Sequence, residues 1–174
     1  MNILFALVLI LFAAFSRLIP HTPNFTPLIS TALFAGAYLQ KRFAFIVPLA
    51  ALLMSDLLIG FYGFSSMAFV YGSFLLIVAL GLMISNKVST IRVAGLSLTG
   101  AVLFFIVTNF GVWVVPNSMY PRTFSGLVEC YVMAIPFFGN TVISTLIFSA
   151  VMFGVYEAAE RFVFKVKEVK EIQQ

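Results

Sequence analysis

Residues 91–115 read IRVAGLSLTGAVLFFIVTNFGVWVV, with Arg92 as the only charged side chain. An α-helix needs about 20 predominantly apolar residues to cross a bilayer, so this stretch is long enough to span a membrane. The composition of the whole chain agrees, because 62% of its 174 residues are hydrophobic, only 9% are charged and the mean hydropathy is +1.11. Soluble domains carry roughly a quarter charged residues. The sequence therefore predicts an integral membrane protein.

Comparable apolar stretches lie on both sides of this segment and end where charged or proline-rich residues interrupt them. They predict an all-α integral membrane bundle, with residues 1–164 as a single six-helix domain and residues 165–174 as a charged cytoplasmic tail. Residues 125–138 are too short and too polar to cross comfortably, and are predicted as a short extra helix, re-entrant or at the surface. The six predicted spans are residues 3–19, 27–39, 43–61, 67–85, 91–115 and 140–164.

The basic residues predict the orientation of the bundle. With six spans both termini lie on one side, and eight of the ten Lys and Arg residues fall on that side. Cytoplasmic loops are enriched in Lys and Arg, so both termini are predicted to be cytoplasmic, in a multi-pass protein of the inner (plasma) membrane. The net charge of +4 is interpreted as a topology signal, and no nucleic-acid partner is predicted. The eight residues are Lys41, Arg42, Lys87, Arg92, Arg161, Lys165, Lys167 and Lys170.

Polar side chains concentrate at the opposite, predicted outer side. Residues 17–27, RLIPHTPNFTP, contain three prolines and the only histidine, and the prolines exclude a regular helix there. Polar groups in a membrane are costly unless they are paired, so this concentration favours a pocket for a small-molecule ligand. Polar pairs that fix helix packing are the alternative. The candidate ligand-binding residues are Arg17, His21, Asn24, Asp56, Asn109, Trp113, Tyr120 and Arg122.

Asp56 is the strongest of these candidates, because it is an acidic residue in the outer half of a predicted span. It either lines the pocket or forms a structural ion pair with Arg17 or Arg122. Trp113 either stacks on a flat ligand or anchors its helix at the membrane interface. Cys130 is interpreted as a packing residue, with a soft ligand role as the alternative. No metal site is predicted, because one histidine and one cysteine do not provide a ligand set at metal-binding spacing.

Sequence motifs for catalysis are missing from the chain. It contains no G-x-S-x-G nucleophile elbow, no P-loop and no H-E-x-x-H pair. The single histidine, His21, has no nucleophile at a recognisable spacing. The sequence therefore predicts a binding or transport protein without a cofactor, and not an enzyme.

Ten segments between residues 17 and 141 form a recognisable pattern, which covers about residues 17–155 of the chain. They are RLIPHTPNFTP (17–27), ALFAGAY (32–38), PLA (48–50), SD (55–56), TNFGVW (108–113), MYP (119–121), GL (126–127), CY (130–131), AIPFF (134–138) and NT (140–141). Together they resemble a family of small bacterial membrane proteins of unknown function. That family is considered similar to the S components of energy-coupling factor (ECF) transporters.

The resemblance implies an S-component-like bundle that captures a vitamin, a cofactor precursor or a metal-related micronutrient from outside. Residues 17–27 would help to close the pocket. The implied partner is a membrane coupling subunit driven by ATPases. S components often carry an alanine pair four residues apart in helix 1 for docking on that subunit, and the chain lacks such a pair at Ala6, Ala13 and Ala14. This departure favours a protein that works alone.

Two other functions stay open. One is a structural or accessory subunit of a larger membrane complex, supported by the small residues Ala150, Gly154 and Ala158, which recur on one face of the last span. Internal packing is the first interpretation of that stripe. The other function is a membrane enzyme that modifies a bound cofactor, with Cys130 or Asp56 as its reactive group.

Overall fold

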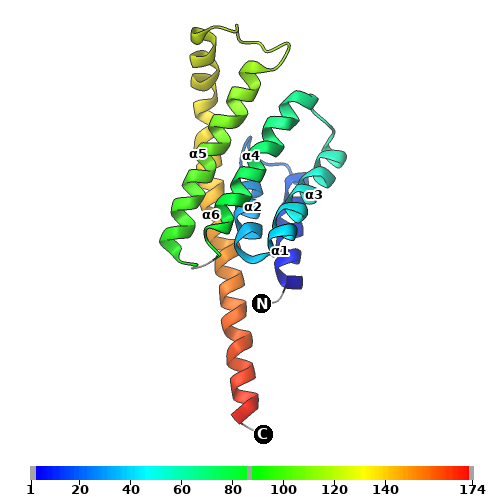
Figure 1. The fold of residues 1–174 in the computed structure, drawn as a ribbon, viewed down its shortest axis with the longest axis vertical. Helices are drawn as coiled ribbons and strands as arrows, with labels where there is room; N and C mark the ends of the chain where they lie inside the picture. Colours follow the sequence, from blue (N-terminus) through cyan, green and yellow to red (C-terminus); the bar gives the residue numbers. More distant parts are fainter. Residues whose placement is uncertain (1–2, 86–87, 173–174) are drawn as a thin grey trace.

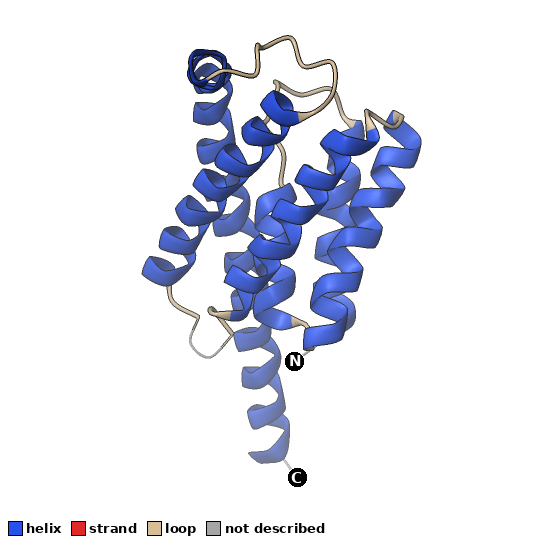
Figure 2. Ribbon diagram, turned by 45° about the horizontal axis from the view of Figure 1, so that its top comes forward, coloured by secondary structure: helices blue, strands red, loops and turns tan. Residues whose placement is uncertain are grey.

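A computed structural model describes residues 3–85 and 88–172, and these residues form helices without any strand (Figures 1 and 2). The all-α prediction is therefore confirmed for the described part of the chain. Six α-helices and one 3₁₀ turn follow one another along the sequence. They are α1 (Ile3–Phe15), η1 (Ser16–Leu18), α2 (Leu28–Tyr38), α3 (Lys41–Ile59), α4 (Phe64–Leu82), α5 (Thr90–Val114) and α6 (Phe124–Ile172).

Local chemistry explains where the helices begin and end. α2 begins directly after Pro27, whose carbonyl accepts bonds from the Thr31 backbone N–H at 2.8 Å and hydroxyl at 2.9 Å. α3 stops at Gly60, which has a φ of 109° that side-chain-bearing residues rarely adopt. α5 begins after Ser89, whose hydroxyl accepts the Arg92 N–H at 3.4 Å.

Helix α2 lies at the centre of the bundle and packs against all the other α-helices. All 11 of its residues are buried, which fits a helix that is apolar or weakly polar around its whole circumference. Its Gly36 faces Gly81 of α4, and a Cβ built on Gly36 would lie 2.8 Å from the Gly81 Cα. The missing side chains let the two helices approach closely. Near the end of α2, Phe34 and Tyr38 pack on aromatic residues of α6.

Four helices, α3, α4, α5 and α6, are long and apolar enough to cross a membrane. The prediction of six spans is not confirmed, because α1 has 13 residues and α2 has 11. A full span requires about 20. The prolines between residues 20 and 27 explain both short helices, since they keep the chain out of regular helix over that stretch.

Helix α6 differs most from the sequence prediction, because it runs without interruption for 49 residues. The predicted separate helix at residues 125–138 is the first part of α6, so that prediction is wrong. Pro136 lies inside the helix instead of ending it. Membrane helices tolerate proline where local adjustment and neighbouring groups satisfy the freed carbonyl. α6 also continues through most of the predicted tail and projects beyond the other helices (Figure 1).

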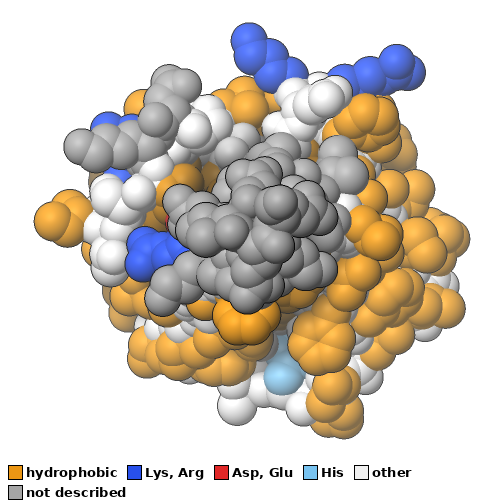
Figure 3. All heavy atoms as spheres, turned by 90° about the horizontal axis from the view of Figure 1, so that it is seen from below, with side chains coloured by type: hydrophobic (Ala, Val, Ile, Leu, Met, Phe, Trp, Pro, Cys, Tyr) orange, Lys and Arg blue, Asp and Glu red, His pale blue; other side chains and the backbone are white. Residues whose placement is uncertain are grey.

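The connections between helices gather at two opposite ends of the bundle (Figure 1). α1 begins and α6 ends at the lower end of that view, which also holds the α2–α3 and α4–α5 connections. Residues 19–27, 60–63 and 115–123 lie toward the other end. Viewed from below, the molecule shows Lys and Arg side chains at its edge and hydrophobic side chains around its flanks (Figure 3). Lys87, which contributed to the predicted orientation, lies outside the described residues.

Candidate functional site

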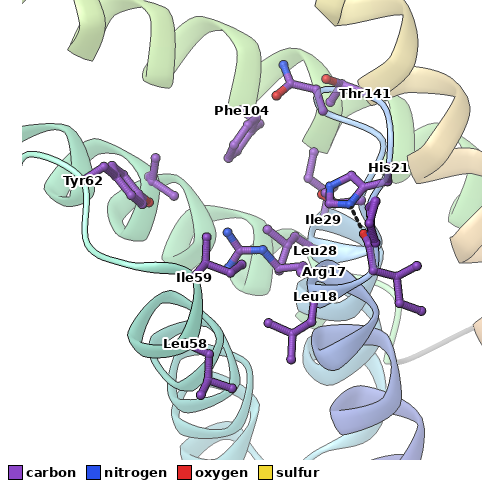
Figure 4. A pocket seen from close by; sticks show the side chains of 15 residues that line it. Arg17, Leu18, His21, Leu28, Ile29, Leu58, Ile59, Tyr62, Phe104 and Thr141 are labelled. Atoms are coloured by element: carbon purple, nitrogen blue, oxygen red, sulfur yellow. Dashed lines mark hydrogen bonds between the residues drawn. The ribbon is translucent and has the colours of Figure 1, made fainter.

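A cavity of about 710 Å³ lies between the proline-rich segment, the end of α3 and the loop that follows it (Figure 4). α4, α5 and α6 each add one side chain to its wall. This volume falls within the roughly 300–1,000 Å³ of small-molecule sites. The lining residues are Arg17, Leu18, Ile19, Pro20, His21, Asn24, Thr26, Leu28, Ile29, Leu58, Ile59, Tyr62, Val70, Phe104 and Thr141.

The charged group of the cavity is Arg17, which comes from the 3₁₀ turn η1. Its Nη1 donates to Asp56 Oδ1 at 2.8 Å and to Ser55 Oγ at 2.6 Å. Asp56 is only 1% exposed, and its second oxygen accepts the Tyr71 hydroxyl at 2.8 Å. Of the two ion-pair partners that the sequence left open for Asp56, the structure selects Arg17.

These contacts use only one of the three guanidinium nitrogens of Arg17. Within the described residues, Nε and Nη2 have no hydrogen-bond partner, whereas Nη1 makes both recorded bonds. The side chain is 15% exposed and extends into the cavity, between Leu28 and Ile59 in the close-up view (Figure 4). Asp56 does not line the cavity. It therefore acts behind the wall, where it holds the guanidinium in place.

The proline-rich segment is tied to α6 by two side chains. Asn140 Nδ2 donates to the Pro23 carbonyl at 3.0 Å, and Ser144 Oγ donates to the Asn24 carbonyl at 3.4 Å. Asn24 adopts a φ of 61°, a left-handed conformation that asparagine tolerates better than most residues. His21 Nδ1 lies 2.7 Å from the Ile19 carbonyl. Because a carbonyl only accepts, Nδ1 carries the proton and the ring presents Nε2 elsewhere.

Tyr62 faces the cavity from the loop between α3 and α4 (Figure 4). Tyr62 is 38% exposed, and the partial desolvation of its phenol raises the pKa to about 12; the Asp56 carboxylate adds to the increase and the Arg17 guanidinium opposes it. An unperturbed tyrosine has a pKa of about 10. The phenol therefore stays protonated at physiological pH and offers both a donor and an acceptor to the cavity.

This shift predicts a distinctive titration for Tyr62. We expect the difference in phenolate absorbance between the wild type and Tyr62→Phe to have its midpoint near pH 12. Because the folded-state pKa lies above the unfolded value of about 10, Tyr62 contributes stability that is complete below that pH and is lost as the pH rises toward the folded-state value. A midpoint at the unperturbed tyrosine pKa of about 10 would show that neither burial nor Asp56 shifts the pKa of Tyr62.

Four predicted site residues lie away from the cavity wall, at the end of α5 and in the loop after it: Asn109, Trp113, Tyr120 and Arg122. Asn109 Nδ2 donates to the Phe105 carbonyl of its own helix at 2.8 Å. Trp113 Nε1 donates to the Pro121 carbonyl at 3.0 Å, so it holds the loop against α5. Arg122 is exposed and Tyr120 is half-buried. The structure thus brings Arg17, His21 and Asn24 together, with Asp56 behind them.

Cys130 is a buried residue of α6, and its Sγ donates to the Asn109 carbonyl at 3.4 Å. This contact supports the interpretation of Cys130 as a packing residue between α5 and α6. Within the part of the chain that the structure describes, no group of three or more His, Cys, Asp or Glu side chains is placed to hold a metal ion.

Several residues of the site were not predicted from the sequence. Tyr62 and Tyr71 surround the Arg17–Asp56 pair, and Asn140 holds the proline-rich segment. For Tyr62 a signal existed, because it lies between Gly60 and Gly63 in a loop at the same predicted side as Asp56. Tyr71 is one polar group within an apolar helix, and nothing in its spacing indicates which helix it faces.

Four long apolar helices around a buried central helix, with a polar cavity near one end, define a helical protein suited to a membrane. The chain belongs to DUF6580, a family of unknown function, whose sequence profile matches residues 1–168. No curated protein and no solved structure matches the chain. Membership of a family of unknown function is thus confirmed, while the likeness to ECF S components stays a prediction.

Proposed function

We propose that the protein is a substrate-binding membrane transport protein similar to an ECF S component. It captures a small micronutrient, which is a vitamin, a cofactor precursor or a metal-related compound. The observation that carries this proposal is the cavity, in which a buried carboxylate holds an arginine that still has free donors. These donors are not buried away from solvent, so a polar group of a ligand that enters the cavity can bind them in place of water.

The chemistry of the cavity favours binding over catalysis. Arg17 is the only charged residue on the described part of its wall, and an arginine in a protein stays protonated, so it does not act as a general acid or base. Asp56 has an ion-pair partner on one oxygen and a hydroxyl donor on the other. Its role is to position Arg17, and the proposed function contains no enzymatic step.

The orientation of the protein is part of the same proposal. We place both termini in the cytoplasm of a cell with the protein in its inner membrane, and the cavity toward the outer side. Lys41, Arg42 and Arg92 begin α3 and α5 at the end of the bundle where α6 terminates, which supports this orientation through the bias of basic residues toward the cytoplasm. A membrane coupling subunit with ATPases is the candidate partner for the transport step.

Native mass spectrometry of the purified full-length protein tests this proposal. We expect the wild type to retain a small molecule at one copy per chain. Arg17→Gln should lower the retained fraction about tenfold or more, because a hydrogen bond to a charged group contributes about 1.5–3 kcal/mol. Arg122→Gln is the matched control, since Arg122 is exposed and does not line the cavity. Equal retention in both variants, or none in the wild type, would count against a binding function.

One observation favours the second candidate, an accessory subunit of a membrane complex. Ala150 and Gly154 line a second cavity of about 330 Å³ between α5 and α6. A Cβ built on Gly154 meets no atom of the described chain within 4 Å. The sequence interpretation expected internal packing to cover this stripe, and at Gly154 no described residue of the chain covers it. Co-purifying subunits without a bound small molecule would favour this second function.

A further inference from the structure

We infer that the cavity takes a ligand with one carboxylate group on a largely apolar body, and that the free edge of the Arg17 guanidinium binds this carboxylate. The inference rests on the proposed binding function and names the chemical class of its substrate. Three features of the site carry it: the geometry of the free guanidinium edge, the charge of the cavity wall and the composition of that wall.

The guanidinium edge has the right shape for a carboxylate. Arg17 uses Nη1 for both of its recorded bonds, to Ser55 and Asp56. The Nε and Nη2 groups lie on the other edge of the same rigid plane and provide two parallel N–H donors. Two parallel donors match the two oxygens of a carboxylate in a bidentate pair. Because Asp56 and Ser55 fix the plane from behind, the free edge is already oriented before a ligand arrives.

The charge of the wall limits the ligand to a single negative charge. Arg17 is the only Lys, Arg, Asp or Glu among the 15 described lining residues shown in Figure 4. Its charge is already shared with Asp56, and His21 is the only other basic side chain among the described lining residues, so the wall offers no second permanent cation for a dianion such as a phosphate monoester. Asp56 itself does not reach the cavity, and its two oxygens are engaged. A ligand ammonium group therefore has no anionic partner on the described wall.

The rest of the wall suits an apolar body with a weakly polar end. Ile29, Val70 and Phe104 supply apolar surface from three different helices. Phe104 points into the cavity above Arg17 in the close-up view (Figure 4). Asn24 and Tyr62 add neutral polar groups at two sides. Apolar walls with a few placed polar groups are typical of small-molecule sites, where the polar groups set the ligand's orientation.

Three matched probes test the charge requirement: 2-naphthoate, 2-naphthamide and 2-naphthyl phosphate. They share one aromatic body and differ in the polar group. Binding to the full-length protein in lipid nanodiscs is measured by ligand-observed NMR, with empty nanodiscs to subtract partitioning into lipid. We expect 2-naphthoate to bind at least tenfold more tightly than the amide and the phosphate. Equal binding of the acid and the amide, or tighter binding of the phosphate, would overturn the inference.

Two substitutions at Arg17 assign the preference to its free edge. Arg17→Gln should remove the preference for the acid over the amide. Arg17→Lys keeps a positive charge next to Asp56 and so protects the fold, but it lacks the planar fork, and we expect it to reduce the preference about tenfold. Arg122→Gln should bind all three probes as the wild type does. A preference that survives in Arg17→Lys at full strength would show that charge alone, without the fork, selects the ligand, and would refute the bidentate contact.

The identity of the co-purified molecule separates this inference from the proposed function. A retained ligand that contains a carboxylate and is lost in Arg17→Lys supports both. A retained ligand without a carboxylate, lost in Arg17→Gln but kept in Arg122→Gln, would overturn the carboxylate inference and leave the binding function standing. A wild-type protein that binds neither a co-purified molecule nor any probe would overturn both.

Discussion

Asp56→Asn is expected to lower the free energy of unfolding by about 3 kcal/mol, since loss of one partner of a buried ion pair leaves the other charge uncompensated. Asp56 is 1% exposed and the Arg17 side chain 15% exposed, so water replaces little of the lost interaction. The substitution also changes the acceptor of the Tyr71 hydroxyl, which links α3 to α4. Unfolding in mixed detergent and dodecyl sulfate micelles, followed by the fluorescence of the only tryptophan, Trp113, measures the effect.

Glu129→Gln is the matched control for this experiment. Glu129 is an exposed carboxylate of α6, outside the described cavity wall, and its substitution also removes one negative charge. We expect its unfolding free energy to change by about 0.5 kcal/mol or less, as for most surface substitutions. If Asp56→Asn and Glu129→Gln unfold at the same mole fraction of dodecyl sulfate, this result would contradict a stabilising role of the Arg17–Asp56 pair between η1 and α3.

Gly36→Ala is expected to lower the free energy of unfolding by up to about 3 kcal/mol, near the upper end of the usual penalty for overpacking. A Cβ at residue 36 would collide with the Val78 carbonyl oxygen and lie 2.8 Å from Gly81 Cα, and both of these neighbours are backbone atoms. A side chain can rotate away from such a contact, whereas α4 must move as a whole. Because α2 is the central helix, this movement disturbs the entire bundle. The same unfolding assay reports the loss.

Gly154→Ala provides the control, since it adds the same methyl group to a glycine within a helix. The new Cβ meets nothing of the described chain within 4 Å, and alanine is a better helix former than glycine by up to about 1 kcal/mol. We expect this variant to be as stable as the wild type or slightly more stable. If Gly154→Ala lowered the free energy of unfolding as much as Gly36→Ala, the close approach of α2 and α4 would not explain the destabilisation in Gly36→Ala.

The long helices were predictable because each long apolar stretch must satisfy its own backbone hydrogen bonds. Residues 91–115 were predicted as a span, and the structure has α5 at Thr90–Val114. The spans predicted at 43–61 and 67–85 correspond to α3 and α4, shifted by two or three residues. The predicted break before the last helix was wrong because residues 125–138 were judged too short and too polar to span, whereas the structure joins them to the following helix, which accommodates Pro136.

The candidate site was only partly predictable. Polarity against an apolar background identified Arg17, His21 and Asn24, since few polar residues occur in such a chain. The same criterion also selected Asn109 and Trp113, whose hydrogen bonds go to nearby backbone carbonyls instead of the cavity. A polar side chain in a membrane helix needs a partner, but the sequence does not state whether that partner is a ligand, another helix or its own backbone.

The sequence by itself determined that the chain is helical and suited to a membrane, because hydropathy and span length depend only on the order of residues. It also determined that its few polar groups would need partners. The tertiary structure alone decided that Arg17 pairs with Asp56, that α2 is the buried centre and that the Arg17 donors face a cavity. Those features depend on which helix faces pack against each other. Arg17 and Asp56 are 39 positions apart, and local sequence spacing does not predict a contact over that separation.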